Sequence, residues 1–425
     1  MGIVYENEQP VERVILVGIS ERNGDDTESS LAELAELAAT AGAEVVGTVI
    51  QNLEHMHPGT YVGTGKLEEI RDMIWEKEAT GIICDDELSP IQMRNMEQVL
   101  DSKVMDRTLL ILDIFAARAR TSEGKIQVEL AQLKYRASRL AGFGRSMSRL
   151  GGGIGTRGPG EKKLEIDRRL IGHRTAQLNR ELKEVVRHRE LTRSQRMKSH
   201  TKVAAIVGYT NAGKSTLLNH LTNAEVLEED KLFATLDPTT RILELTNNQK
   251  VLMTDTVGFI RKLPHHLIEA FRSTLEEAKY ADIILHVVDA SNPQMDEQMY
   301  TVYETLQNLG VKDKPVITVF NKIDCMEDIW VPRDLRADYH VKISAKTGEG
   351  ITGFLQSIEA VLRERKVEIE ALYPYKEAGK IQKIRKYGEL QEEEYREDGI
   401  FVRAFVPAEL YGQVRPEGVT PNNCL

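Results

Sequence analysis

Short apolar runs alternate along the chain with longer segments in which apolar residues recur every three or four positions. In the first part of the chain the runs cover 14–18, 44–50 and 81–85, and the periodic segments cover 31–40, 66–78 and 90–100. The runs predict strands and the periodic segments predict helices. Because strands that alternate with helices usually pair in parallel, we expect residues 1–115 to form a small α/β domain.

The pattern then becomes helical and basic. Apolar residues between Ile126 and Leu140 are spaced four and three apart, and a seven-residue apolar repeat runs from Leu164 to Val185. Such repeats predict two helices that pack against each other. We therefore expect residues 116–200 to form an antiparallel helical hairpin.

Apolar runs and helical segments alternate again after residue 201. The runs cover 203–207, 250–254, 315–320 and 341–343, and the helical segments cover 216–221, 264–279 and 294–309. This alternation predicts a second α/β domain over residues 201–364. The remainder, residues 365–425, is expected to be a small α+β appendix that starts with a charged helix and includes an alternating strand at 399–406.

A glycine-containing loop follows the predicted strand at 203–207. It comprises Gly208, Tyr209, Thr210, Asn211, Ala212, Gly213, Lys214, Ser215 and Thr216. The spacing G-x-x-x-x-G-K-[ST] is typical of a phosphate-binding loop, in which glycines let backbone N–H groups curl around a β-phosphate. Lys214 is then placed to reach the β- and γ-phosphate oxygens, and the Ser215 hydroxyl to bind Mg²⁺.

A second motif follows the predicted strand at 250–254. It comprises Asp255, Thr256, Val257 and Gly258. We expect the Asp255 carboxylate to hold Mg²⁺ through a water molecule and the Gly258 N–H to contact a γ-phosphate. Lys214, Asp255 and Gly258 are therefore candidate catalytic residues.

Two further motifs follow the last two predicted strands of this domain and indicate which nucleotide base is bound. One comprises Asn321, Lys322, Ile323 and Asp324, and the other comprises Ser344, Ala345 and Lys346. The Asp324 carboxylate can accept hydrogen bonds from N1–H and the 2-amino group of guanine, which adenine does not offer, while the Lys322 stem covers the ring. Since all four motifs stand at carboxyl ends of predicted strands, where open α/β sheets bind ligands, we expect GTP or GDP with Mg²⁺.

The N-terminal domain contains a partial copy of such a loop, Gly63-Thr64-Gly65-Lys66. Leu67 has no hydroxyl for Mg²⁺, and no glycine stands six positions before the lysine, as Gly208 does before Lys214. The motif is therefore incomplete. We expect this domain to be a docking module, with an ATP-driven second site as the weaker alternative.

Charge is unevenly distributed along the chain. The net charge is −10, yet residues 123–200 hold 19 Lys and Arg against 8 Asp and Glu, so the remainder carries −21. This segregation favours a nucleic-acid partner for the hairpin. The glycine-rich segment 142–161 carries Arg145, Arg149 and Arg157, which we predict to contact RNA phosphates. A flexible tether, or an arm for protein contacts, is the alternative.

Composition gives no sign of a membrane or secreted protein. No stretch reaches the roughly 18 apolar residues of a membrane span, and the N-terminus lacks a basic-then-apolar signal. The three cysteines, Cys84, Cys325 and Cys424, are scattered. We expect a cytoplasmic protein with no disulfide partner and no transmembrane segment.

These motifs, together with two further segments, resemble those of the HflX family of bacterial GTPases, within the Obg-HflX group. The segments are Phe233-Ala234-Thr235-Leu236-Asp237, which continues to Arg241, and Gly155-Thr-Arg-Gly-Pro-Gly-Glu161. The resemblance covers nearly the whole chain. It implies a GTPase that binds the 50S ribosomal subunit, contacts 23S rRNA and splits ribosomes, often under heat stress or antibiotic challenge. We expect the protein to be a monomer.

The resemblance also implies roles for single residues. It makes Thr235 the second Mg²⁺ ligand beside Ser215, whereas Thr239 and Thr240 remain competitors from sequence alone. Many small GTPases have a water-orienting glutamine directly after Asp-x-x-Gly, but this chain has Phe259. We therefore expect slow intrinsic hydrolysis that the ribosome stimulates.

Asn211 occupies the position that supplies a K⁺ ligand in some potassium-stimulated GTPases. A bond across the loop is an equally open role for this side chain. For the whole protein, two other functions remain open: a GTPase that assembles the 50S subunit or remodels RNA, and a signalling GTPase whose hairpin binds proteins.

Overall fold

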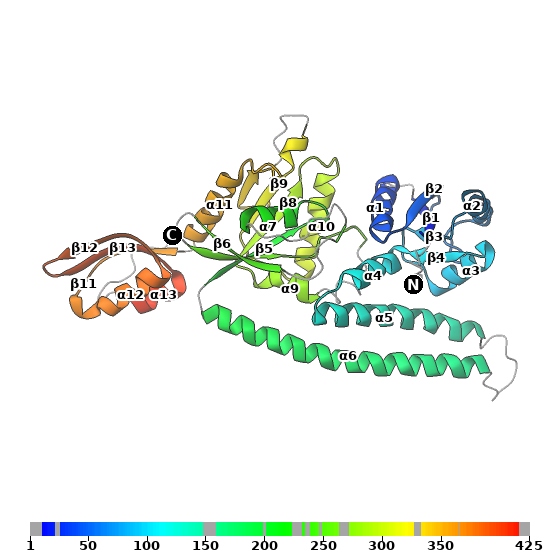
Figure 1. Cartoon of the computed structure of the whole chain (residues 1–425), viewed down its shortest axis with the longest axis horizontal. Coiled ribbons are helices and arrows are strands. Elements are labelled where there is room, and N and C mark those ends of the chain that lie inside the picture. The colour runs from blue at the N-terminus through cyan, green and yellow to red at the C-terminus, as the bar shows by residue number, and fades with distance from the viewer. Residues whose placement is uncertain are drawn as a thin grey trace, which may run out of the picture.

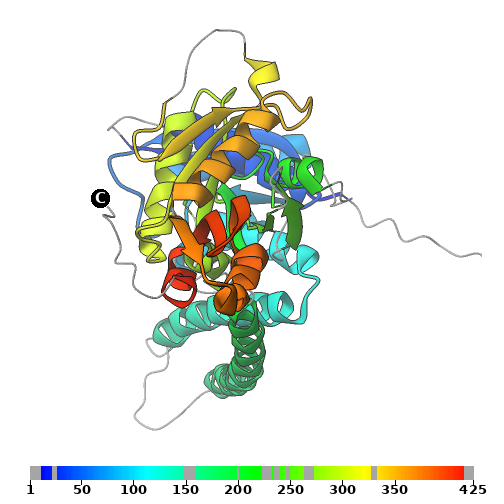
Figure 2. The same cartoon turned by 90° about the vertical axis from the view of Figure 1, so that its left-hand side faces the viewer.

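The computed structural model describes residues 11–21, 26–147, 159–198, 201–222, 232–233, 239–245, 249–262, 272–326, 333–364 and 366–415. Three domains, each built on its own sheet, lie in a row, and a long helical hairpin runs beneath two of them (Figure 1). Seen along the row, the hairpin stands below the sheets (Figure 2). The predicted fold class is confirmed: a phosphate-loop α/β domain preceded by a small α/β domain and a helical hairpin, and followed by an α+β appendix.

The N-terminal domain has a parallel four-stranded sheet in the order β2-β1-β3-β4. Its elements are β1 (Arg13–Ser20), α1 (Thr27–Thr40), β2 (Glu44–Asn52), α2 (Thr64–Lys77), β3 (Gly81–Cys84), α3 (Pro90–Leu100), β4 (Lys103–Asp106) and α4 (Arg107–Arg118). Apolar side chains of α1 and α4 cover one face of the sheet, and those of α2 and α3 cover the other. The sequence pattern misses β4, because only Val104 and Met105 in it are apolar.

The hairpin consists of α5 (Ser122–Met147) and α6 (Pro159–Lys198), which pack antiparallel as predicted (Figure 1). Leu178 of the predicted heptad repeat is 1% exposed. Both Nε and Nη2 of Arg174 donate to the Glu129 carboxylate, at 2.6 and 2.9 Å. Arg189 contacts Glu123 at 3.1 Å and Glu276 at 3.2 Å, and so links the hairpin to the central domain.

The central domain has a six-stranded sheet in the order β10-β9-β8-β5-β7-β6. Its elements are β5 (Lys202–Gly208), α7 (Lys214–Thr222), β6 (Thr239–Glu244), β7 (Lys250–Asp255), α9 (Arg272–Tyr280), β8 (Ile283–Asp289), α10 (Met295–Asn308), β9 (Val316–Asn321), β10 (Tyr339–Lys342) and α11 (Ile351–Glu364). Among the strands that the structure describes in this sheet, only the edge strand β6 is antiparallel to its neighbour. The predicted helix at 264–279 is described from Arg272 onward, and β6 and β8 are not among the predicted strands.

The C-terminal domain is an antiparallel sheet in the order β11-β13-β12. Its elements are β11 (Lys366–Tyr373), α12 (Ala378–Tyr387), β12 (Glu389–Arg396), β13 (Gly399–Pro407) and α13 (Ala408–Val414). The predicted charged helix at its start is wrong, because this segment is β11. Ile369 and Tyr373 are buried while Glu368 and Glu370 are exposed, so its charges follow the period of a strand.

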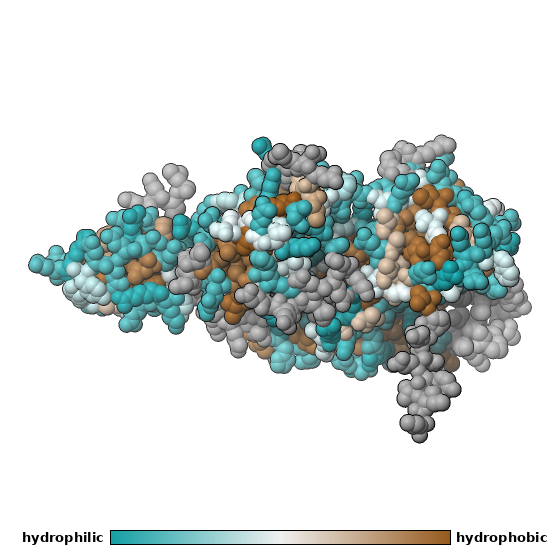
Figure 3. Space-filling model, turned by 45° about the horizontal axis from the view of Figure 1, so that its top comes forward, coloured by the Kyte–Doolittle hydropathy of each residue, from teal (hydrophilic) through white to brown (hydrophobic). Residues whose placement is uncertain are grey.

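Among the described residues, no helix is long and apolar enough to cross a membrane. The face of the molecule in Figure 3 mixes hydrophilic surface with separate hydrophobic areas on the domains. Cys84 is buried and free, and Cys325 is exposed and free.

Candidate nucleotide-binding site

The carboxyl ends of four neighbouring strands bring the predicted motifs together. Strand β5 ends at Gly208, β7 at Asp255, β8 at Asp289 and β9 at Asn321. The strand order places these ends side by side, with β5 between β7 and β8. The site therefore lies at the edge where open α/β sheets bind ligands.

Two glycines shape the phosphate loop. A Cβ on Gly208 would lie 2.2 Å from the backbone oxygen of Val287, and one on Gly213, where φ is +87°, would lie 2.3 Å from Nδ2 of Asn321. Any larger residue at these positions would collide with the neighbouring strands. Asn211 also has a positive φ of 59°, so the loop has the tight left-handed turns that a phosphate cradle requires.

Lys214 is buried between the phosphate loop and the Asp-x-x-Gly motif. Its Nζ donates to the carbonyl of Tyr209 at 2.6 Å. A Cβ on Gly258 would lie 3.0 Å from the same Nζ. Burial lowers the pKa of Lys214 to about 8, against the opposing effect of the Asp255 carboxylate.

Two of the residues predicted to hold Mg²⁺, Ser215 and Asp255, are adjacent. Oγ of Ser215 donates to Oδ2 of Asp255 at 2.9 Å, and Asp255 is 0% exposed. The Thr256 hydroxyl donates to the carbonyl of Ile206 at 2.7 Å and ties this motif to β5. Hydroxyl and carboxylate oxygens are the hard ligands that Mg²⁺ prefers, so this pair of residues fits the ion.

The segment after Asp255 pairs with the phosphate loop. Tyr209 and Phe259 form a parallel bridge, in which Thr210 N donates to the Phe259 carbonyl at 2.8 Å and Phe259 N donates to the Gly208 carbonyl at 3.1 Å. A Cβ on Gly258 would lie 2.8 Å from Cγ2 of Thr210, so this close approach requires glycine. The Phe259 side chain is 2% exposed and apolar, and it offers no hydrogen bond to an attacking water.

Asn321 connects the loops of the expected base-binding part. Its Nδ2 donates to the carbonyl of Ala212 at 2.9 Å, and its Oδ1 accepts from Ala345 N at 2.9 Å. Asp324 is exposed, and a hydrogen bond from the Ser344 side chain lowers the pKa of this carboxyl. The carboxylate is therefore ionised at neutral pH and is available as an acceptor.

Asp289, which no sequence motif indicated, holds Nζ of Lys322 at 2.7 Å. The available signal was the apolar run of β8, which ends in this carboxylate. Lys322 itself has a positive φ of 64°. The ion pair fixes the direction of the side chain that is expected to cover the base.

Several predicted residues lie outside the described part of the chain. They are Ala234, Thr235, Leu236, Asp237, Arg149 and Arg157. Arg145 belongs to α5, but its side chain is not among those described. Phe233 is described: it is 3% exposed and its ring meets that of Phe115 edge-on, with centroids 4.6 Å apart.

The partial phosphate loop of the N-terminal domain has a different geometry. Gly63 precedes α2, and Thr64, Gly65 and Lys66 form the first turn of this helix. Nζ of Lys66 lies 2.6 Å from Glu69 on the same helix.

A cavity of about 420 Å³ opens between the phosphate loop and α1 of the N-terminal domain. Glu33 and Glu36 line it on one side, and Asn211 and Asn292 line it on the other. Burial raises the pKa of both glutamates, against the opposing charges of Arg107 on Glu33 and of Lys322 on Glu36. The sequence patterns gave no signal for this contact between domains.

A phosphate loop, an Asp-x-x-Gly motif and an Asn-Lys-x-Asp motif on neighbouring strand ends define a P-loop GTPase. The chain matches three family models: "GTP-binding GTPase N-terminal" over residues 28–116, "GTP-binding GTPase Middle Region" over 118–196 and "50S ribosome-binding GTPase" over 203–322. It is 67% identical to the GTPase HflX of Lacrimispora saccharolytica over 414 residues, which are 97% of this chain and 98% of the relative. The chain therefore belongs to the HflX family of GTPases, and the predicted family and the predicted GTPase activity are confirmed.

Two other comparisons cover most of the chain. The GTPase HflX of Escherichia coli is 43% identical over 351 residues, which are 82% of each chain. A GTP-binding protein from Sulfolobus solfataricus, solved in complex with GDP, is 24% identical with a TM-score of 0.44, and the match covers 82% of this chain and 98% of that chain.

Proposed function

We propose that this GTPase acts on the ribosome: its GTP form binds the 50S subunit and separates the subunits, and hydrolysis to GDP and phosphate resets it. The observation that carries the proposal is the match of residues 203–322 to the 50S ribosome-binding GTPase model, in a domain where the predicted nucleotide motifs meet at one sheet edge. We place the protein in the cytoplasm as a monomer.

In this proposal, different residues of the chain bind different parts of GTP. The phosphate loop and Lys214 neutralise the phosphates, Gly258 N–H contacts the γ-phosphate, and Asp324 selects guanine. Ser215 and Asp255, with Thr235, would hold Mg²⁺, which neutralises charge on the β- and γ-phosphates when bound. Since Phe259 cannot orient the attacking water, hydrolysis is slow until the 50S subunit orders this segment.

The hairpin is the proposed contact with 23S rRNA. Arg149 and Arg157 stand in the chain between the end of α5 at Met147 and the start of α6 at Pro159. This end of the hairpin lies away from the central domain, beneath the N-terminal domain (Figure 1). Guanidinium groups there suit an RNA surface that is recognised through phosphates and shape.

We propose K⁺ as a second cation, bound near Asn211. This residue lines the cavity beside the phosphate loop, and its side chain makes no hydrogen bond across the loop to any described residue. A cation there would lie near the bridge between β- and γ-phosphates. Hydrolysis rates that are equal in potassium and sodium salts would contradict this role.

The experiment that tests the ribosomal function is sedimentation of 70S ribosomes with the protein and a non-hydrolysable GTP analogue. GDP and a variant lacking residues 142–160 are the controls. We expect 70S particles to fall to 50S and 30S only with the analogue and the intact hairpin. Binding to 50S without splitting would favour an assembly GTPase, and no binding would favour a signalling role.

A further inference from the structure

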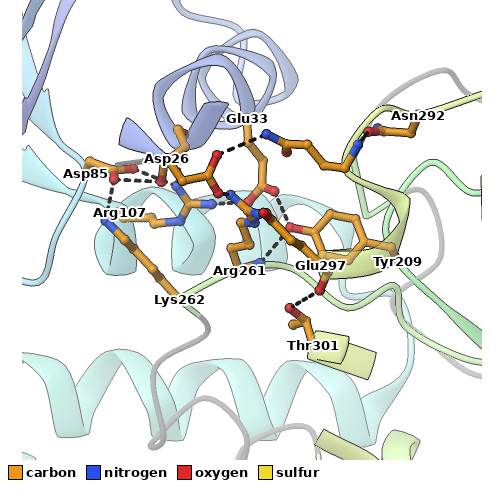
Figure 4. A network of polar contacts seen from close by, with 12 residues as sticks. Asp26, Glu33, Asp85, Arg107, Tyr209, Arg261, Lys262, Asn292, Glu297 and Thr301 are labelled. Atoms are coloured by element: carbon orange, nitrogen blue, oxygen red, sulfur yellow. Dashed lines mark hydrogen bonds and ion pairs between the residues drawn. The ribbon is translucent and has the colours of Figure 1, made fainter. Parts of the chain in front are cut away.

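The N-terminal domain contacts three segments that face the nucleotide site. These are the phosphate loop, the pair Leu232 and Phe233, and the segment 257–262 that follows Asp255. Apolar residues of these segments share one hydrophobic cluster with α1, α4 and α5. Figure 4 shows the polar contacts of the same interface. A change in the position of these segments therefore alters their packing against the N-terminal domain.

The hydroxyl of Tyr209 is the point where the phosphate loop, the segment 257–262 and α1 meet. It accepts a hydrogen bond from the backbone N–H of Arg261 at 2.9 Å and donates one to Glu33 of α1 (Figure 4). The ring is 4% exposed and belongs to the shared cluster. Tyr209 thus adds a side-chain bond at residue 261 to the two backbone bonds that the phosphate loop makes with Phe259.

Glu33 is itself held in place from inside the N-terminal domain. Its carboxylate accepts from the Arg107 guanidinium, and Arg107 also contacts Oδ1 of Asp85 at 2.7 Å. Arg107 is 2% exposed, so it has almost no freedom to turn toward solvent. The acceptor for the Tyr209 hydroxyl is consequently presented in a fixed direction.

We propose that Tyr209 is a positioning residue for GTP hydrolysis, and that Glu33 of the N-terminal domain orients its hydroxyl. Phe259 cannot bind the attacking water, so the alignment of that water depends on the backbone of residues 257–261. Tyr209 holds this backbone against the phosphate loop at Arg261. Through Glu33, the N-terminal domain then helps to hold the backbone that aligns the attacking water.

The test is steady-state GTP hydrolysis without ribosomes, so it rests on the GTPase activity and not on the ribosomal partner. Tyr209→Phe removes the hydroxyl and keeps the buried ring. We expect kcat to fall about 5- to 10-fold, the equivalent of one oriented hydrogen bond, with KM and GDP affinity changed by less than about twofold. Glu33→Ala should cause a similar loss, and Glu33→Gln, which keeps an acceptor oxygen, should recover part of it.

A double-mutant cycle separates positioning from simple destabilisation. If the two residues act as one unit, Tyr209→Phe combined with Glu33→Ala should lower kcat no further than either change alone. The matched control is Tyr339→Phe, which removes a hydroxyl that donates to Glu364 at 2.5 Å on the exposed side of the same domain. It should leave kcat unchanged.

Three results would overturn the proposal. The first is an unchanged kcat in Tyr209→Phe. The second is a parallel loss of kcat, GDP affinity and melting temperature, which would indicate a structural role only. The third is additive effects of the two changes with no recovery in Glu33→Gln.

Discussion

The ammonium group of Lys262 lies 2.5 Å from Oδ2 of Asp85, a carboxylate that is 1% exposed, although the two residues are 177 positions apart. It also lies 2.7 Å from Oδ1 of Asp86. Both carboxylates follow β3, beside the point where the strand order of the N-terminal sheet reverses. Ligands of open α/β sheets bind in such a crevice, and here a lysine of the GTPase domain reaches into it.

Reversal of the charge at this contact should loosen the two domains. Lys262→Glu places a carboxylate against Asp85 and Asp86, so we expect the free energy of unfolding to fall by about 1 to 2 kcal/mol. The loss is limited because the lysine is partly hydrated in the folded protein. A lower melting temperature and faster proteolysis between the domains would be the readout. Asp86→Lys in the same chain should restore part of the loss, whereas an equally unstable double variant would argue against the contact.

A change at Asp324 should alter the choice of base. Asp324→Asn replaces a carboxylate acceptor with an amide, so we expect GTP affinity to fall roughly 100-fold, the equivalent of two charge-assisted hydrogen bonds. Xanthosine triphosphate, whose C2 carries an oxygen in place of the amino group, should bind better to this variant than to the parent. Competition with a fluorescent GDP measures both, and unchanged selectivity would remove Asp324 from the base site.

Loss of the Ser215 hydroxyl should raise the Mg²⁺ concentration that GTP hydrolysis requires. We expect Ser215→Ala to raise the Mg²⁺ concentration for half-maximal hydrolysis by about tenfold or more, because one oxygen ligand is missing. The control is Ser357→Ala on α11, whose hydroxyl donates to the local carbonyl of Phe354 at 2.7 Å. An identical Mg²⁺ titration for both variants would contradict the assignment.

Lys214 should make stability depend on pH. Its pKa is lowered to about 8 in the folded protein, so between about pH 8 and the usual lysine pKa near 10.4 the unfolded chain binds more protons than the folded one. Stability then rises with pH across this window. We expect the gap in unfolding free energy between the parent and Lys214→Met to change by about 1.5 kcal/mol from pH 8 to pH 9.5, in favour of the parent. Thermal unfolding without nucleotide at both pH values measures it, and parallel pH profiles would refute the shift.

The arginines of the hairpin should act through RNA phosphates. Changing Arg145, Arg149 and Arg157 to Ala should weaken binding to 50S subunits and lower the dependence of affinity on salt by about one unit of slope per lost phosphate contact. A control variant changes three other arginines, Arg385, Arg396 and Arg403, of the C-terminal domain. If the parent and both variants show the same dependence of affinity on salt, a hairpin that contacts proteins would be favoured.

Local motifs were the most predictable part of this protein. The alternation of strands and helices predicted the α/β class, and the glycine spacing from Gly208 to Gly213 predicted a tight loop at a strand end. Both depend on backbone preferences and on neighbours close in sequence. Less regular elements were not predicted correctly. Strand β4 is too short to show a period. Strand β11 carries charges on alternate positions, and its high charge content suggests a helix unless their two-residue spacing is taken into account.

The chemistry at the strand ends follows from local sequence, because a phosphate loop and an Asn-Lys-x-Asp motif consist of adjacent residues with fixed torsions and fixed functional groups. The surroundings of these groups come from the folded arrangement: the bond of Asn321 to Ala212, the ion pair of Lys322 with Asp289, and the contacts of Tyr209 with Glu33 and Arg261. These partners are far apart in the chain, up to 176 positions for Tyr209 and Glu33. Their meeting depends on the order of the strands and on the packing of one domain against another, and neither leaves a local pattern in the sequence.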